Sequence, residues 1–454
     1  MRNYGLFLVG ASLLCAQERT VQPRVREILD AVSEQRIAAN IQKLAGFETR
    51  NTLSSQGNAA ARQWIAGELR SYSPRLEVSL EHFKLKQNEE RIFQDVDLYN
   101  VVAVLRGTSL PETQVVVSAH YDSLNLIPLA SETAESGDSV ADRPVKYDWT
   151  KVDAPAPGAN DDGSGTAAVM ELARVLSRYE FAKTLVFVAF AGEEQGLIGS
   201  TLHAAKAHRE SRTIEAVLNN DIIGGEVSGN GRVGNGVVNV YSDEVPDSPS
   251  QALARYARRI AERYLPSVRV GTVWMQDRLG RGGDHTPFQW EGFAAVRFST
   301  PNENYAHEHS ATDLPEFVSA AYTARVARVN AAVAASLAQA PKPPVVMEEA
   351  KTGALKGRLV PQISRGKSRY DAQLKWKNAG PETNLKGYAI VMRPTTAAEW
   401  EQEVFVGNVK EYLFKDVSID DVRFGVKAID NDGNESLISP YVYPPRVKRE
   451  VPVY

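Results

Sequence analysis

Two adjacent carboxylates, Glu193 and Glu194, follow an apolar run at residues 185–190 that predicts a buried strand. The carboxyl ends of strands in α/β sheets are where ligands bind, so the pair is expected near a site. Two acids this close repel each other unless one binds a metal ion and the other holds a proton. Taken alone, such a pair is more often a solvent-exposed turn, so the metal hypothesis depends on the rest of the chain.

Four more segments each place one metal-competent side chain after an expected strand or in a loop: His120, Asp161, Asp221 and His309. With Glu194 they supply two imidazoles and three carboxylates. Two hydrolytic cations about 3.5–4 Å apart need one bridging carboxylate, and each needs a histidine and a carboxylate of its own. These ligands suit zinc, although manganese or cobalt could also bind. Each residue alone has an ordinary structural explanation, so the hypothesis requires all five together.

Five motifs surround these residues in a fixed order: His120-Tyr-Asp122, GANDDGSG from Gly158, EEQGLIGS from Glu193, Asn-Asn-Asp221 and His309-Ser-Ala-Thr-Asp313. Over about residues 30–338 the chain resembles the secreted di-zinc exopeptidases. These include bacterial leucyl aminopeptidases, aminopeptidase S, aminopeptidase Y and glutamate carboxypeptidase. The resemblance implies a zinc-dependent exopeptidase that hydrolyses peptide bonds and holds two zinc ions per chain.

The resemblance also implies a role for each residue. Asp161 would bridge the two zinc ions, with Glu194 and His309 on one ion and His120 and Asp221 on the other. Glu193 would be the general base, and Asp122 would orient the imidazole of His120. Asp313 would act in the same way near His309. A cis peptide bond between Asp161 and Asp162 is also implied.

Several assignments stay open. His307 competes with His309 as a ligand, and Tyr241 and Tyr305 are both candidate oxyanion donors. Asp284-His285 is either part of the pocket wall or the start of a helix.

The resemblance favours an aminopeptidase, and three alternatives remain. Arg278 and Arg281 could clamp a carboxylate, as a carboxypeptidase of the glutamate carboxypeptidase type would require. A glutaminyl cyclase uses a similar scaffold with one metal ion. A non-catalytic binding protein is the least favoured alternative, because no ligand or base is missing.

Alternation of helical and strand patterns predicts an α/β fold, a three-layer sandwich with a mostly parallel central sheet. The helices are expected at residues 24–44, 59–72, 166–179, 249–264 and 315–340. The strands are expected at residues 76–83, 99–105, 115–117, 185–190, 216–218, 237–241 and 294–298. The long loop 123–157 separates two ligand segments, so it is expected to border the pocket.

The length of 454 residues predicts two domains. The net charge of −4 does not indicate a positively charged surface that would bind nucleic acid. Residues 17–340 would form the zinc peptidase domain. The proline-rich segment 341–344 predicts a stiff linker. Alternating apolar residues beyond it predict a C-terminal all-β sandwich over residues 345–454, which resembles a fibronectin type III domain. The sequence indicates no oligomeric state.

Residues 1–16 predict a signal peptide, with Arg2 as its positive start, residues 5–15 as its apolar core and cleavage near Ala16. A lipoprotein signal ending at Cys15 and a membrane anchor are weaker alternatives. No segment of the mature chain has the roughly 20 apolar residues of a membrane span. Because Cys15 is the only cysteine, metal ligands must be His, Asp and Glu. A secreted or bacterial periplasmic protein is expected, with peptides as its substrates.

Overall fold

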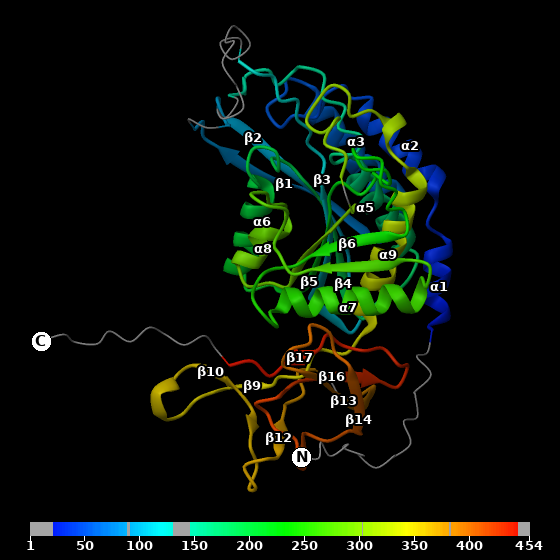
Figure 1. Ribbon diagram of the computed structural model, residues 1–454. Helices are drawn as coiled ribbons and strands as arrows, with labels where there is room; N and C mark the ends of the chain where they lie inside the picture. The colour runs from blue at the N-terminus through cyan, green and yellow to red at the C-terminus, as the bar shows by residue number, and fades with distance from the viewer. Residues whose placement is uncertain (1–20, 89–90, 130–145, 302, 381–382, 444–454) are drawn as a thin grey trace, which may run out of the picture.

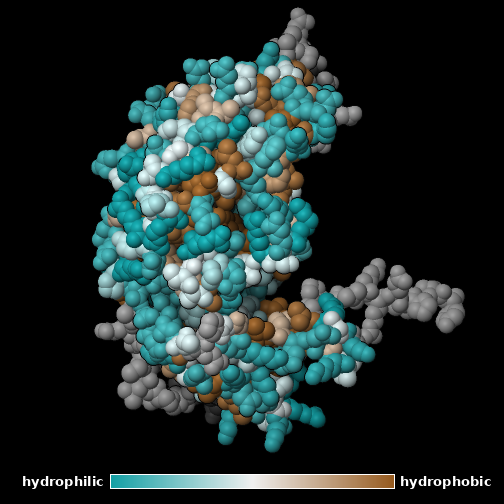
Figure 2. Space-filling view, turned by 180° about the vertical axis from the view of Figure 1, so that it is seen from behind, coloured by the Kyte–Doolittle hydropathy of each residue, from teal (hydrophilic) through white to brown (hydrophobic). Residues whose placement is uncertain are grey.

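The computed structural model describes residues 21–88, 91–129, 146–301, 303–380 and 383–443. The expected signal peptide, residues 1–16, lies outside the described residues, as does 130–145 of the long loop. Figure 1 shows a larger α/β domain above a smaller β domain. From behind, an apolar strip runs down the middle of the larger domain between polar borders (Figure 2).

One eight-stranded sheet forms the centre of the larger domain, in the order β1-β2-β4-β3-β5-β8-β6-β7. Its strands are β1 Leu76–Leu85, β2 Val96–Leu105, β3 Leu110–His120, β4 Lys183–Phe190, β5 Thr213–Asn220, β6 Val237–Tyr241, β7 Arg269–Val273 and β8 Ala295–Ser299. The four central strands, β4, β3, β5 and β8, run parallel, and β1 and β2 pair antiparallel at one edge. Every residue of β4 is buried, as expected for a parallel strand covered on both faces.

Helices cover both faces of this sheet. One face carries α1 Pro23–Asp30, α2 Glu34–Ala45, α3 Gly57–Tyr72, α5 Gly163–Leu176, α7 Pro249–Tyr264 and α9 Ala320–Gln339, which share one apolar core with the strands. The other face carries α6 Ile198–Arg209 and α8 His285–Trp290, which pack on a smaller core through Ala204, Ala207 and Phe288. The structure thus confirms the predicted three-layer α/β fold.

Two expected helices are divided in the structure. The predicted helix 24–44 is two helices, because the chain turns at Val32, which is buried, and Ser33 caps α2 by accepting the N–H of Arg36. The predicted helix 315–340 is a short 3-10 turn, Pro315–Phe317, followed by α9, which Ser319 caps. The edge strand β7 was not predicted, since its sequence RVGTV contains a glycine and only one of its residues is fully buried.

The C-terminal domain consists of antiparallel sheets, as predicted. A three-stranded sheet joins β11 Ile363–Ser364, β12 Ala372–Lys375 and β15 Glu411–Phe414, and a four-stranded sheet joins β14 Gln402–Gly407, β13 Leu385–Pro394, β16 Val422–Asp430 and β17 Ser439–Pro440. Their inward residues, which include Leu374, Ile390 and Phe424, form one core. A separate hairpin pairs β9 Met347–Glu349 with β10 Leu359–Pro361, and a 3-10 turn, Gly353–Leu355, lies between these two strands.

Helix α7 lies against the C-terminal domain (Figure 1), and largely buried ion pairs join the two. The carboxylate of Glu435 is 2.7 Å from Arg259, 2.6 Å from Arg263 and 2.6 Å from Lys427. Burial favours the neutral acid, but the three cations outweigh it and hold the pKa of Glu435 below its ordinary value. One largely buried carboxylate therefore contacts side chains of both domains.

Replacing Glu435 with glutamine is expected to lower the free energy of unfolding by about 3 kcal/mol at pH 7, because the largely buried Arg259 and Arg263 lose their carboxylate partner, whereas Lys427 keeps Glu403. The depressed pKa means that this stability is present above pH ~4.3 and is lost as the pH falls below it. Denaturant unfolding at pH 7 and at acidic pH measures both effects. Glu262→Gln is the control, since Glu262 pairs with Arg258 on the surface. Equal losses in the two variants would contradict this account.

None of the described helices combines the length and the apolarity that a membrane span requires.

Candidate active site

The parallel strands bring the predicted residues to one edge of the sheet. His120 is the last residue of β3, Asp221 follows the last residue of β5, and Glu193 and Glu194 come three and four residues after β4. Asp161 comes just before α5, and His309 lies in the loop before α9. All six side chains line one cavity of about 330 Å³. The sequence-predicted ligands and base therefore meet at the carboxyl edge of the sheet.

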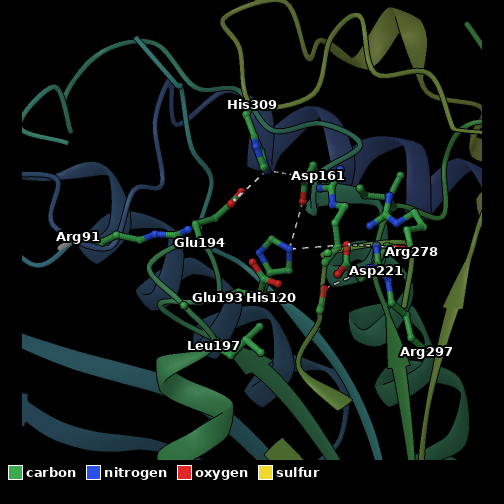
Figure 3. Close-up of a pocket in the computed structure, with 15 residues that line it drawn as sticks. Arg91, His120, Asp161, Glu193, Glu194, Leu197, Asp221, Arg278, Arg297 and His309 are labelled. Atoms are coloured by element: carbon green, nitrogen blue, oxygen red, sulfur yellow. Dashed lines mark hydrogen bonds and ion pairs between the residues drawn. The ribbon is translucent and has the colours of Figure 1, made fainter. Parts of the chain in front are cut away.

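Asp161 lies at the centre of this group (Figure 3). Its Oδ1 is 3.1 Å from Nε2 of His120, and its Oδ2 is 3.1 Å from Nε2 of His309. The same His309 nitrogen is 3.1 Å from Oε2 of Glu194, and Nε2 of His120 is 3.8 Å from Oδ1 of Asp221. The two oxygens of one carboxylate thus face two separate groups of ligand atoms.

These distances fit zinc. Two ligand atoms bound to one tetrahedral zinc ion lie about 3.4 Å apart, given bond lengths of about 2.0–2.1 Å. The separations of 3.1 Å to 3.8 Å are of that size. Oε1 of Glu194 is buried without a hydrogen-bond partner in the described part of the chain, as expected for an atom that would face a cation. Glu308 also lies close to Asp161 and His309.

Glu193, which was predicted to be the general base, lines the same cavity as the five predicted ligands. Burial raises the pKa of its carboxyl well above the ordinary value, and the charges of Glu194, Asp221 and Asp284 raise it further. A carboxyl group of raised pKa can accept a proton and return it near neutral pH.

Asp122 lies behind the cavity, beside His120. Nδ1 of His120 is 3.2 Å from the backbone oxygen of Asp122 and 3.6 Å from its carboxylate, so the nearer acceptor is the backbone. The carboxylate accepts the backbone N–H groups of Glu193 and Glu194, both at 3.3 Å. Asp122 therefore contacts the backbone of the base as well as the imidazole.

Two further buried acids hold the backbone around Asp161. The peptide bond between Asp161 and Asp162 is cis. The carboxylate of Asp162 accepts N–H groups from His120, Gly165 and Ile222 at 2.9–3.3 Å, which ties together three segments of the site. Asp313 was expected to orient the imidazole of His309. Its carboxylate accepts the N–H of Asp161 at 2.9 Å, and so supports the segment that carries Asp161.

Arg297 is a site residue that sequence reasoning missed. Its side chain is 1% exposed, and its guanidinium lies 3.1 Å from Oδ1 of Asp221 and 2.5 Å from Oδ2 of Asp277. Arg297 lowers the pKa of Asp221 against the effect of burial, so Asp221 is held as a carboxylate. An arginine within the otherwise apolar strand 294–298 was the available signal, because buried charges are paired.

Of the two candidate histidines, His309 is the one that contacts Asp161 and Glu194 among the described residues. The ring of His307 instead stacks on Phe317 at 3.9 Å between centroids, and its Nδ1 is 3.0 Å from Oγ1 of Thr312. Neither of the tyrosines considered as oxyanion donors, Tyr241 and Tyr305, lines the cavity.

Asp284 and His285 were predicted to be either part of the pocket wall or the start of a helix. They lie at the start of α8, and both are buried behind the pocket wall. Burial, together with the charges of Asp122 and Asp221, raises the pKa of Asp284 to about 7. Nε2 of His285 is 2.7 Å from the backbone oxygen of Gln276, which fixes the ring.

The described ends of the long loop 123–157 reach the site, as expected. The N–H of Leu126 donates to the backbone oxygen of His309 at 2.9 Å. The ring of Trp149 packs against the guanidinium of Arg91, which lines the cavity, at 4.9 Å from the ring centroid.

The model of Peptidase family M28 matches residues 100–334, which include every predicted site residue. A probable zinc metalloprotease of Pyricularia oryzae is 38% identical over 449 residues, covering 90% of this chain and 82% of its own. A second one, from Leptosphaeria maculans, is 35% identical and covers 94% of this chain and 97% of its own.

Solved structures share the fold. LapA aminopeptidase of Legionella pneumophila aligns with a TM-score of 0.54 at 20% identity, covering 71% of this chain and 76% of its own. A zinc aminopeptidase from Bacillus subtilis aligns with a TM-score of 0.50 at 16% identity, covering 66% and 94%. The family model and the curated relatives span the site that the sequence predicted, so the chain belongs to peptidase family M28 and is a zinc metallopeptidase.

Proposed function

We propose that the protein is an exopeptidase with two zinc ions, bridged by Asp161. His309 and Glu194 would hold one ion, and His120 and Asp221 the other. The observation that supports this most directly is that the two oxygens of Asp161 each lie 3.1 Å from a different histidine. Zinc, when bound, would polarise the scissile carbonyl and acidify the attacking water.

Glu193 is the proton carrier in this proposal. Its carboxylate takes a proton from the attacking water and returns it to the leaving amine as the peptide bond breaks. Its raised pKa suits both transfers, and Asp122 holds its backbone N–H in place. The charged side chains of the proposed ligands are largely buried. Electrostatic interactions with a bound substrate are stronger there than in water.

We infer an aminopeptidase rather than a carboxypeptidase. The solved structures of similar fold include aminopeptidases. The two arginines that could have clamped a terminal carboxylate are engaged, because Arg278 contacts Asp277 and Glu303, and Arg281 binds Glu308.

Hydrolysis of amino-acid amides, measured against N-acetylated dipeptides, tests this proposal. The zinc-loaded enzyme is expected to cleave free-amine substrates, to lose activity with a chelator, and to recover it when zinc is added. Preference for N-acetylated dipeptides would indicate a carboxypeptidase. Cyclisation of an N-terminal glutamine peptide without amide hydrolysis would indicate a glutaminyl cyclase.

Two proposals concern the rest of the chain. We infer export from the cell, on the signal-like sequence of residues 1–16. We also infer a fibronectin type III-like C-terminal domain, which the pairing of a three-stranded with a four-stranded antiparallel sheet supports.

Replacing Arg297 with methionine is expected to weaken zinc binding and to lower activity, each by about 10–100-fold. The variant leaves Asp221 and Asp277 without their shared cation, so the pKa of Asp221 rises and protons compete with zinc. Titration with a zinc chelator and steady-state rates measure the two effects. Arg269→Met, at an exposed arginine, is the control. Unchanged zinc affinity in the Arg297 variant would show that Arg297 does not tune Asp221.

A further inference from the structure

The cavity that holds the proposed zinc ligands also contains four arginine side chains. Three of them are paired with acids: Arg297 with Asp221 and Asp277, Arg278 with Asp277 and Glu303, and Arg281 with Glu308. The fourth, Arg91, has no carboxylate partner among residues 21–88, 91–129, 146–301, 303–380 and 383–443. Among the four cavity arginines, Arg91 is therefore the one that forms no ion pair with a described carboxylate.

The backbone of Arg91 is held by hydrogen bonds within the connection between β1 and β2. The side-chain oxygen of Asn88 accepts the N–H groups of Arg91 and Ile92, both at 3.1 Å. The N–H of Asn88 donates to the oxygen of Ile92 at 2.6 Å, and the Ile92 side chain is buried. These bonds anchor the backbone of Arg91, which lowers the entropic cost of binding a ligand there.

The guanidinium of Arg91 is oriented from two sides. Its Nη1 donates to the backbone oxygen of Glu194 at 3.0 Å, and the ring of Trp149 lies 4.9 Å from its central carbon. Figure 3 shows Arg91 reaching toward Glu194 from the side opposite Arg278 and Arg297. A guanidinium has five N–H donors in a fork that matches a carboxylate. The exposed side chain thus offers further donors at the cavity, next to a proposed zinc ligand, that no hydrogen bond to the described residues occupies.

We propose that Arg91 binds a carboxylate of the peptide substrate and so favours peptides that carry one near the scissile bond. This inference rests on the proposed peptidase function. A cavity of about 330 Å³ has room for little more than the residues on either side of the scissile bond. The carboxylate is therefore either the free C-terminus of a dipeptide or an acidic side chain beside that bond.

Steady-state kinetics of Arg91→Gln and Arg91→Lys on four substrates test this inference. Leucyl-glycine and leucyl-glycinamide differ only in the C-terminal carboxylate, and the para-nitroanilides of glutamate and leucine differ in the side-chain carboxylate. Arg91→Gln is expected to raise KM about tenfold for the carboxylate-bearing member of one pair, with kcat within about twofold. The neutral members should be unaffected, and Arg91→Lys should recover part of the loss.

The pair that responds identifies the source of the carboxylate. In the wild type, the KM of that substrate should also rise with salt, because an exposed ion pair is screened. Arg24→Gln is the matched control, since Arg24 packs over Tyr179, at 5.7 Å from the ring centroid, and does not line the cavity. Equal changes for charged and neutral substrates, or no change for any, would overturn the inference while leaving the peptidase function intact. If the zinc-loaded wild type cleaved none of the four, both would fail.

Discussion

Replacing Glu193 with glutamine is expected to lower kcat about a thousandfold, while the zinc content stays at the wild-type value. Glutamine keeps the size of the side chain but cannot carry a proton from the attacking water to the leaving amine. Glu193 makes none of the close contacts that join Asp161 to the two histidines, so the ligand group should remain intact. Rates on an amino-acid amide, with elemental analysis of the same sample, measure both quantities.

Glu316→Gln is the matched control, because Glu316 is exposed and lies beyond the His309 segment. It should retain wild-type rates. A Glu193→Gln enzyme that kept near wild-type turnover would show that another group moves the proton. Loss of zinc together with activity would show that Glu193 acts as a ligand instead.

Replacing Asp161 with alanine is expected to remove both zinc ions and all measurable hydrolysis. Its two oxygens each contact a different histidine, so among the described side chains Asp161 is the one placed to serve both proposed ion positions. Without the bridging carboxylate, two dications held about 3.5–4 Å apart would also repel each other more strongly. Elemental analysis after dialysis, with rates on an amino-acid amide, measures the outcome.

Asp420→Ala, at an exposed acid of the C-terminal domain, controls for loss of a carboxylate. Asp161→Asn, which keeps the shape of the side chain, separates loss of charge from any effect on folding, and circular dichroism checks the fold of each variant. Retention of two zinc ions in both Asp161 variants would contradict the bridging role.

The sequence predicted that certain residues at strand ends would lie close together, because the carboxyl ends of parallel strands meet at one edge of the sheet. His120 ends β3, Glu194 and Asp221 follow the neighbouring parallel strands β4 and β5, and each strand was visible as an apolar run. The helix boundaries were predicted less well. One buried turn residue, Val32, and one capping residue, Ser33, divided a segment whose helical spacing looked continuous.

The contacts of the supporting residues could not be predicted in the same way, because they join residues far apart in the sequence. Asp162 binds backbone groups of β3 and of the segment after β5, and Asp313 binds the N–H of Asp161, 152 residues earlier. Arg91 reaches the cavity from the β1–β2 connection, far in sequence from every motif. Spacing reveals none of these contacts, which depend on how distant loops pack over the sheet edge.

The central claim is that Asp161 lies between two zinc ions. A crystal structure of the zinc-loaded protein, with anomalous differences measured at the zinc edge, tests this most directly. We expect two anomalous peaks about 3.5–4 Å apart on either side of the Asp161 carboxylate. One peak should lie beside His309 and Glu194, and the other beside His120 and Asp221. A single peak, or peaks out of reach of Asp161, would contradict the two-ion site.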